Sequence, residues 1–178
     1  MAWQTKPSGT STVDRRAEPY YTQAMRDEID QRYRPRYETP HACLLPALHL
    51  VQHAYHWVPP QAMLEISEHL EIPAADVLDT ASFYEEYSLE PMGGTTIAVC
   101  RSIACEVCDH AKLTEALMDE LGIEVGETTE DGKFTLVELE CLGACGGAPA
   151  ALVGEKLCEF MTPEKLLAEV RAAKSDGH

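Results

Sequence analysis

Apolar side chains recur every three or four positions between residues 22 and 83, a spacing that predicts helices with one buried face. The longest repeat lies in residues 41–57, with Pro46 in its first turn, where proline is tolerated. Its apolar residues at helical spacing are Leu44, Leu45, Leu48, Val51, Ala54 and Tyr55. Shorter repeats, separated by prolines, predict helices over residues 22–33, 61–70 and 73–83. Together they predict a small α-helical bundle over residues 20–91.

The pattern changes after residues 91–94 (PMGG), which carry the residues of a turn. Short apolar runs then alternate with amphipathic stretches of helical period. The runs predict four strands, over residues 95–99, 134–139, 150–153 and 157–160. The amphipathic stretches predict helices over residues 106–121 and 163–173. Residues 92–178 are therefore expected to form an α/β domain with helices packed on a four-stranded sheet.

Acidic residues dominate the chain, whose formal net charge is −16. Residues 37–100 contain nine acidic residues and no Lys or Arg. A negatively charged surface repels nucleic acid and anionic lipid, so neither is an expected partner. No apolar run approaches the roughly 18 residues of a membrane span, so we expect no direct membrane insertion. Residues 1–19 are rich in Ser, Thr, Pro and Gly and lack the apolar core of a signal peptide, which predicts a disordered N-terminal extension on a cytoplasmic protein.

Two predicted strands each end in a loop that carries a pair of cysteines. Cys100 and Cys105 follow the first strand, and Cys141 and Cys145 follow the second, in the small-residue stretch 140–149 (ECLGACGGAP). Small residues let the backbone approach a bound group closely and leave amides free to point at it. Four thiolates at one end of a sheet match the number that holds an iron–sulfur cluster. The sequence therefore predicts such a cluster here.

Other uses of these thiols stay open on spacing alone. Structural zinc sites favour two-residue gaps, and the gaps here are four and three residues. Cys100, Cys105 and Cys108 with a distant Cys141 fit the plant-type ferredoxin spacing, but that choice leaves Cys145 unused. Cys105 and Cys108 also have the spacing of a thiol–disulfide pair. The simpler interpretation of Cys108 is a thiol on the first turn of the helix predicted over residues 106–121. A disulfide framework is disfavoured in a reducing compartment and by the odd count of seven cysteines.

Several segments resemble a known family. Residues 126–145 (GETTEDGKFTLVELECLGAC) are similar to the thioredoxin-like [2Fe-2S] ferredoxin subunit of complex I, the NADH:quinone oxidoreductase. Residues 44–52 (LLPALHLVQ) and 81–84 (ASFY) resemble the same family, and the likeness runs from about residue 25 to residue 173. Cys108 departs from the family pattern, which commonly has a small residue other than cysteine there.

The resemblance implies a fold, a cofactor and partners. The fold would be a thioredoxin-like ferredoxin domain, residues 92–178, preceded by the helical bundle. Cys100, Cys105, Cys141 and Cys145 would ligate one [2Fe-2S] cluster, which would exchange single electrons with FMN on a partner flavoprotein that also binds NADH. Further iron–sulfur subunits would complete a complex on the cytoplasmic face of the inner membrane. Related subunits occur in NAD-linked hydrogenases and formate dehydrogenases. A zinc-stabilised interaction module without a redox role is the alternative from another class.

The remaining candidate residues are expected to serve the fold. His49, His53 and His56 share one helical face that could bind a metal ion, but histidines packed in or on the bundle explain them more simply. Cys43 and Cys158 lie in apolar stretches and are expected to be small core residues. No catalytic residue is predicted, because an electron carrier needs no general base or nucleophile of its own.

Overall fold

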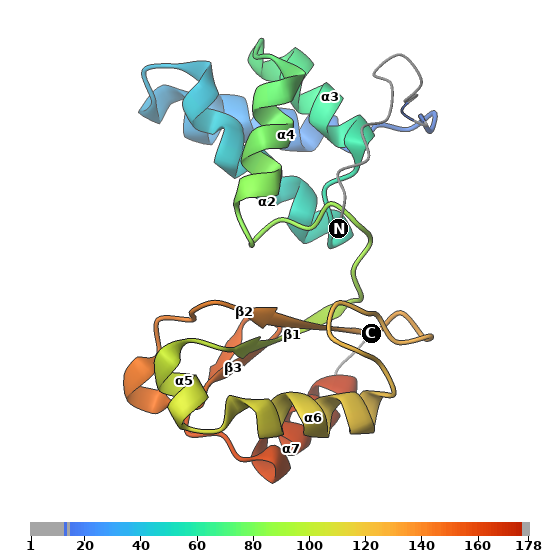
Figure 1. Cartoon of the computed structure of the whole chain (residues 1–178). Coiled ribbons are helices and arrows are strands. Elements are labelled where there is room, and N and C mark those ends of the chain that lie inside the picture. The colour runs from blue at the N-terminus through green and yellow to red at the C-terminus, as the bar shows by residue number, and fades with distance from the viewer. Residues whose placement is uncertain (1–12, 14, 176–178) are drawn as a thin grey trace, which may run out of the picture. The chain divides into compact units, whose positions relative to one another are not determined.

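The computed structural model describes residues 13 and 15–175. The chain divides into two compact units, unit 1 up to Pro91 and unit 2 from Met92 onward (Figure 1). Each unit has its own hydrophobic core. Residues 1–12 and 14 of the extension predicted to be disordered lie outside the described residues. Among the described residues, no helix combines the length and the apolar character needed to cross a bilayer.

Unit 1 is helical, as the periodicity predicts. Its helices are α1 (Gln23–Glu28), α2 (Leu44–Tyr55), α3 (Pro60–Leu70) and α4 (Ala74–Phe83). Helix α1 is capped by the Thr22 side chain and runs on as the π-helical η1 (Ile29–Tyr33) and the 3₁₀ turn η2 (Arg34–Arg36), and a further 3₁₀ turn, η3 (Pro40–Cys43), leads into α2. Leu44, Leu48 and Val51 are buried, but Leu45 and Ala54 are exposed, so the buried face of α2 is narrower than predicted.

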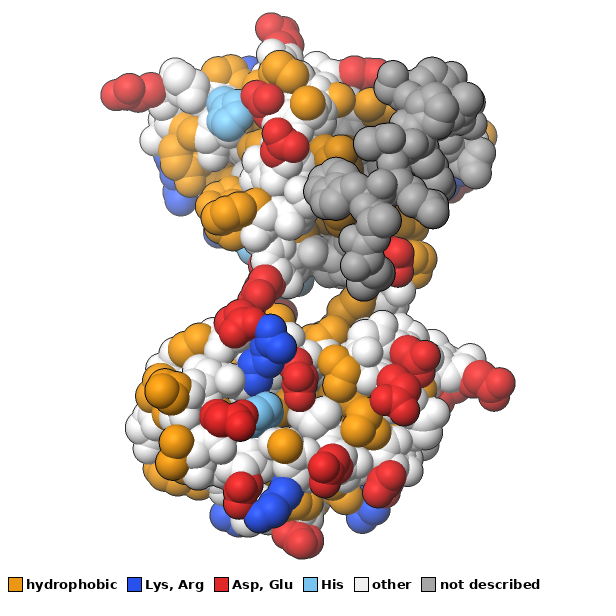
Figure 2. Space-filling model, viewed as in Figure 1, with side chains coloured by type: hydrophobic (Ala, Val, Ile, Leu, Met, Phe, Trp, Pro, Cys, Tyr) orange, Lys and Arg blue, Asp and Glu red, His pale blue; other side chains and the backbone are white. Residues whose placement is uncertain are grey.

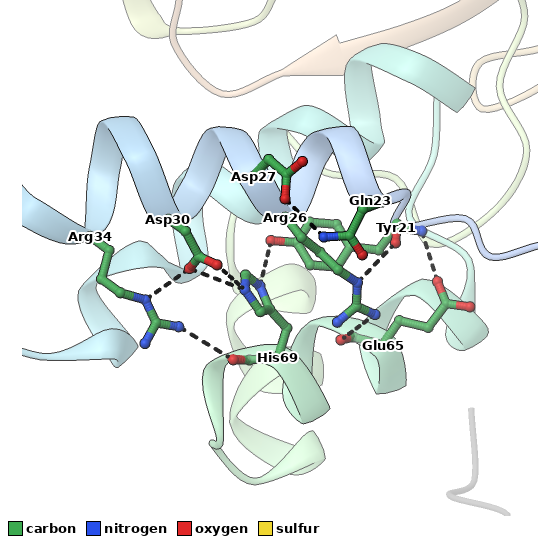
Figure 3. Close-up of polar contacts among 8 residues, drawn as sticks. All are labelled: Tyr21, Gln23, Arg26, Asp27, Asp30, Arg34, Glu65 and His69. Carbon is green, nitrogen blue, oxygen red and sulfur yellow. Dashed lines mark hydrogen bonds and ion pairs between the residues drawn. The ribbon is translucent and has the colours of Figure 1, made fainter.

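A chain of polar contacts ties α1 and η1 to α3 (Figure 3). The hydroxyl of the buried Tyr21 lies 3.0 Å from Nδ1 of His69, and the other ring nitrogen of His69 lies 3.2 Å from the Asp30 carboxylate. Nε of Arg34 lies 3.0 Å from the same carboxylate. Because the Tyr21 side chain is buried, the pKa of its hydroxyl is raised and it stays protonated at neutral pH.

Unit 2 is built on a four-stranded sheet. Its strands are β1 (Thr95–Cys100), β2 (Phe134–Leu139), β3 (Ala151–Val153) and β4 (Lys156–Cys158), in the order β2-β1-β3-β4. Strands β1 and β2 are parallel, and the other two pairs are antiparallel. Helices α6 (His110–Leu121) and α7 (Pro163–Ser175) lie on one face of the sheet (Figure 1). Their Leu113, Leu117, Leu166 and Val170 side chains pack with the buried strand residues of that face, which confirms the predicted α/β layers.

The helix predicted over residues 106–121 is in fact two helices. A short α5 (Ile103–Val107) comes first, and α6 begins only at His110. Between them Asp109 adopts a left-handed backbone with φ of 59°, which ends the first helix and redirects the chain. Cys108 therefore lies at the end of α5 and not on the first turn of the long helix. Strand β4 also ends earlier than predicted, at Cys158, and Phe160 two residues later has a left-handed backbone with φ of 52°.

Acidic side chains are spread over the visible face of each unit and few basic ones accompany them (Figure 2). This distribution accords with the net charge of −16.

Candidate iron–sulfur site

The two cysteine loops begin side by side at one edge of the sheet. Strands β1 and β2 run parallel with Cys100 opposite Leu139, and the Arg101 N–H donates to the Leu139 carbonyl oxygen at 3.0 Å. Parallel strands end at the same edge, so the loop after β1 and the loop after β2 leave the sheet together. Cys141 follows Leu139 by two residues. The pattern of two cysteine loops meeting at one sheet edge is therefore present.

The first pair of thiols is buried. Cys100 is 2% exposed and Cys105 is 1% exposed, and both pack with Ala150 in a small apolar cluster. Cys100 ends β1, whereas Cys105 is carried back toward it by α5. The loop that carries the second pair covers this cluster, since Leu142 and Ala144 pack against it. The two loops are thus in direct contact.

Four hydrogen bonds surround the Cys100 sulfur. Burial alone would raise the pKa of this thiol, but hydrogen bonds from the Ser102 hydroxyl, the Ser102 N–H, the Leu142 N–H and the Cys105 thiol outweigh it, and the pKa is lowered. The Ser102 Oγ lies 3.3 Å from Sγ of Cys100. The Leu142 amide belongs to the other cysteine loop, so that loop helps to stabilise a thiolate at Cys100.

Cys105 has a less favourable setting for the thiolate. Burial raises the pKa of its thiol, and the neighbouring Cys100 raises it further, although the Ala150 N–H acts in the opposite direction. Because the pKa of Cys100 is lowered and that of Cys105 is raised, the pair favours a single thiolate, at Cys100, over two thiolates. A bound cation would favour both thiolates, because metal ions bind sulfur in the deprotonated form.

The second pair of cysteines lies in an open loop. Cys141 and Cys145 are both exposed. Gly143 has a φ of 72°, and its N–H donates to Sγ of Cys141 at 3.3 Å. Cys145 begins the 3₁₀ turn η4 (Cys145–Gly147). This loop exposes its sulfurs where the first loop buries them.

Contacts with the segment after β4 hold the end of this loop in place. The Phe160 N–H donates to the Gly147 carbonyl oxygen at 2.6 Å, and the Met161 N–H donates to the Pro149 carbonyl oxygen at 3.0 Å. A Cβ atom on Gly147 would lie 2.7 Å from Cβ of Glu159, so only glycine fits there without displacement.

The residue types at this site are those of a metal–sulfur centre. The four thiols do not, however, form a complete set of metal ligands in the structure. Among residues 13 and 15–175, no three His, Cys, Asp or Glu side chains lie close enough together to hold a metal ion. The structure brings Cys100 and Cys105 together and places Cys141 and Cys145 on the adjoining loop. Four thiols from two touching loops, with backbone amides directed at sulfur, are the donors that an iron–sulfur cluster uses.

The other candidate residues lie outside this centre. Cys108 is exposed at the end of α5, while Cys105 points into the buried cluster. Cys43 is fully buried and Cys158 is 3% exposed, as expected of core residues. The rings of His49 and His53 are 6.2 Å apart on α2, and within the described part of the chain they belong to no metal-binding group.

Some residues near the site carried no clear sequence signal. His110 is buried at the start of α6, with Nδ1 3.0 Å from Glu106 and Nε2 3.9 Å from Glu138. Thr114 donates to the same Glu138 carboxylate at 2.8 Å. These contacts fasten α6 to β2 next to the cysteine loops. The sequence gives only one sign of these contacts, the carboxylate of Glu138 near the end of a mostly apolar strand.

A four-stranded mixed sheet with helices on one face and two cysteine loops at one edge defines the class of thioredoxin-like ferredoxin domains. The chain belongs to the thioredoxin-like [2Fe-2S] ferredoxin family, because the model of that family matches residues 29–174. The match covers most of both units and includes all four predicted ligands.

Curated relatives agree with this membership. The chain is 41% identical over 119 residues to an NADH-quinone oxidoreductase subunit of Pseudomonas aeruginosa, covering 67% of this chain and 72% of the relative. It is 35% identical over 149 residues to the protein of the same name from Salmonella typhimurium, covering 84% and 90%. It is also 36% identical over 129 residues to NADP-reducing hydrogenase subunit HndA of Solidesulfovibrio fructosivorans, covering 71% and 75%.

Among solved structures, the chain is similar to a chain of an NAD+-reducing [NiFe]-hydrogenase in the air-oxidized state. The TM-score is 0.65 at 25% sequence identity, and the match covers 75% of this chain. It spans only 23% of that hydrogenase chain. The predicted family and fold are thus confirmed, and the family name supports the predicted class of cofactor, an iron–sulfur cluster.

Proposed function

We propose that this chain is the electron-transfer subunit of an NADH:quinone oxidoreductase, with one [2Fe-2S] cluster held by Cys100, Cys105, Cys141 and Cys145. The cluster, when bound, accepts and releases one electron at a time. The observation that carries the proposal is the parallel pairing of β1 with β2, which starts both cysteine loops at one sheet edge. The relatives named as NADH-quinone oxidoreductase subunits support the setting.

The two loops would divide the work of binding. Cys100 and Cys105 form a preorganised half-site, since they are buried and already in contact. Cys141 and Cys145 would supply the other two thiolates from the exposed loop. Leu142 and Ala144 pack over the first pair and keep water from it. The backbone N–H groups near sulfur stabilise negative charge there, which favours the reduced state.

The ion pair of Glu140 with Arg101 also affects how well negative charge is stabilised at the site. Glu140 precedes Cys141, and its carboxylate alone would disfavour added negative charge nearby. Its carboxylate is paired with the Arg101 guanidinium, which follows Cys100. Because the opposite charge offsets that of the carboxylate, the amides are left as the main local influence on sulfur.

The proposed partner is a flavoprotein that binds FMN and NADH. A surface suited to a partner lies beside the first cysteine pair. Ile103 and Val107 are 83% and 80% exposed on α5, one turn apart and on the side away from Cys105. Large apolar side chains exposed to this degree next to a redox centre favour contact with another protein. Through further iron–sulfur subunits, the assembly would sit on the cytoplasmic face of the inner membrane.

A hydrogenase setting is the second candidate. The similarity to NADP-reducing hydrogenase subunit HndA and to an NAD+-reducing [NiFe]-hydrogenase favours it. In that setting the proposed cluster ligands would be the same, and only the partners would differ.

Two measurements test the proposal. The isolated protein should show visible sulfur-to-iron absorption and an EPR signal after one-electron reduction; a colourless protein with stoichiometric zinc would contradict it. Purification of the native assembly should then bring down a flavin-bearing NADH-oxidising subunit and a quinone-reducing membrane arm. A nickel–iron or molybdenum partner would move the assignment to a hydrogenase or a formate dehydrogenase.

A further inference from the structure

Two aromatic side chains at the end of α4 are exposed on the surface of unit 1. Phe83, the last residue of the helix, is 78% exposed, and Tyr84, which follows it, is 44% exposed. Their rings contact each other edge to face, with centroids 5.1 Å apart. Aromatic residues are enriched where proteins bind other proteins, so two adjacent exposed rings indicate an interaction surface.

Contacts with the core of the bundle hold this pair of rings in place. The ring of Tyr84 lies against that of Tyr87, with centroids 6.3 Å apart. Tyr87 is buried, and its hydroxyl donates to the Leu45 carbonyl oxygen on α2 at 3.2 Å. The Tyr87 N–H also donates to the Tyr84 carbonyl oxygen at 3.1 Å. Because these contacts already fix Tyr84, a partner that binds to it loses little conformational entropy.

Carboxylates lie on both sides of the aromatic pair in the chain. Glu85 and Glu86 follow it directly, and Asp79 lies one helical turn before Phe83. All three carboxylates belong to exposed residues, and the ion pairs found among residues 13 and 15–175 include none of them. Residues 37–100 contain no Lys or Arg. The aromatic–acidic patch is defined here as Asp79, Phe83, Tyr84, Glu85 and Glu86.

We propose that the aromatic–acidic patch binds an arginine-bearing segment of a partner protein. A guanidinium group stacks on an aromatic ring and pairs with carboxylates at the same time, whereas a lysine ammonium has no flat face to stack. The carboxylates repel acidic segments, and a purely apolar segment would desolvate them without compensation. A second copy of this chain carries a net charge of −16 and would be repelled as a whole. Charge complementarity therefore selects a basic occupant, and the exposed rings select arginine over lysine.

The proposal concerns unit 1 and does not depend on the proposed cluster. Its first test titrates the full-length protein with acetyl-Gly-Arg-Gly-Arg-Gly-amide and with the same peptide carrying lysine in place of arginine. Amide chemical shifts from NMR report where and how tightly each peptide binds. We expect the shifts to concentrate in residues 79–87. The arginine peptide should bind about two- to five-fold tighter than the lysine peptide, the ratio expected of a cation–π contact at an exposed site.

A ring variant tests why arginine is preferred. Phe83→Ala should abolish the preference for the arginine peptide, because the main stacking surface is lost. The helical content should stay unchanged, since the Phe83 side chain is mostly exposed. Val125→Ala, at an exposed apolar position (40%) of unit 2, is the control and should keep the preference.

A charge variant tests the role of the carboxylates. Glu85→Gln combined with Glu86→Gln should weaken the binding of both peptides several-fold and reduce its dependence on salt. Glu130→Gln combined with Glu155→Gln makes the same change of net charge at exposed positions of unit 2. This control should have the smaller effect, because it leaves the carboxylates of the patch in place.

A crosslink in the native assembly identifies the occupant. Benzoylphenylalanine, a photoreactive analogue of phenylalanine, is placed at position 83, and the crosslinked peptide is sequenced by mass spectrometry. We expect a peptide of another protein that contains arginine. Crosslinking to a second copy of this chain, to a partner segment without arginine, or to nothing would overturn the proposal. Equal affinity of the unchanged protein for the arginine and lysine peptides would overturn it as well.

Discussion

The two cysteine loops of unit 2 carry the same number of thiols but are built in different ways. The loop after β1 is organised by regular structure: a strand ends at Cys100, a short helix carries Cys105, and both sulfurs are buried. The loop after β2 is organised by a glycine turn and one 3₁₀ turn, and it leaves Cys141 and Cys145 exposed. The positions of Cys100 and Cys105 are therefore fixed by a strand and a helix. The position of the loop that carries Cys141 and Cys145 depends instead on its contacts with the segment after β4.

The largest expected effect is loss of the cluster when the open loop loses one ligand. Cys145→Ser removes a thiolate from the proposed set, and a hydroxyl is a poor replacement for a soft ligand. We expect iron content and visible absorption to fall to background, with the helical content retained. Iron and acid-labile sulfide analysis, with circular dichroism as the control for folding, measures this. Full retention of the cluster would remove Cys145 from the ligand set.

The next effect concerns how the open loop is fixed in place. Gly147→Ala puts a methyl group 2.7 Å from Cβ of Glu159, and the loop or the segment after β4 must move. We expect the free energy of unfolding to fall by about 1–3 kcal/mol, as in other overpacked sites. Gly146→Ala is the matched control, because a Cβ there meets nothing within 4 Å. Denaturant titration of both variants measures the difference, and equal stability would mean that Glu159 yields without cost.

Much of this architecture could be predicted from the sequence because it follows from periodicity. The apolar runs before Cys100 and Cys141 identify strands, and two strands that each end in a cysteine loop suggest one shared edge. The break between α5 and α6 could not be predicted, since residues 106–121 keep a helical pattern and the break depends on one left-handed residue, Asp109. Asp is among the residues that tolerate that conformation, but nothing local requires it.

The hydrogen bonds to the thiols of Cys100 and Cys105 also could not be predicted from the sequence. They come from Leu142 and Ala150, whose amides reach the sulfurs only through the sheet topology. Backbone donors of this kind carry no side-chain signature. Ser102 was closer to prediction, because it lies between the two cysteines at the start of a helix.

A smaller effect is expected from substitution of Ser102. This residue lies in the loop after β1, here called the closed loop because its two thiols are buried. The Ser102 hydroxyl lies 3.3 Å from the Cys100 sulfur, also acts on the Cys105 thiol, and makes no capping bond to α5, so Ser102→Ala removes contacts with these two sulfurs and leaves the helix cap unchanged. We expect the reduction potential to fall by about 20–65 mV, the one-electron equivalent of a hydrogen bond of about 0.5–1.5 kcal/mol. Ser102→Thr keeps the hydroxyl and should keep the potential. EPR-monitored redox titration measures both, and an unchanged potential in Ser102→Ala would mean that the hydroxyl does not act on the cluster.

The smallest expected effect is that of Cys108→Ser, and it separates the two possible ligand sets. Cys108 lies three residues after Cys105, yet it is exposed at the end of α5 while Cys105 faces the buried cluster. Its N–H is directed to the carbonyl oxygens of Ala104 and Cys105, which fixes it as part of the helix end. We therefore expect iron content, the EPR line shape and the reduction potential to match those of the unchanged protein. Loss of the cluster in this variant, with retention in Cys145→Ser, would instead select the plant-type ligand set, in which the closed loop supplies three thiolates and the open loop only Cys141.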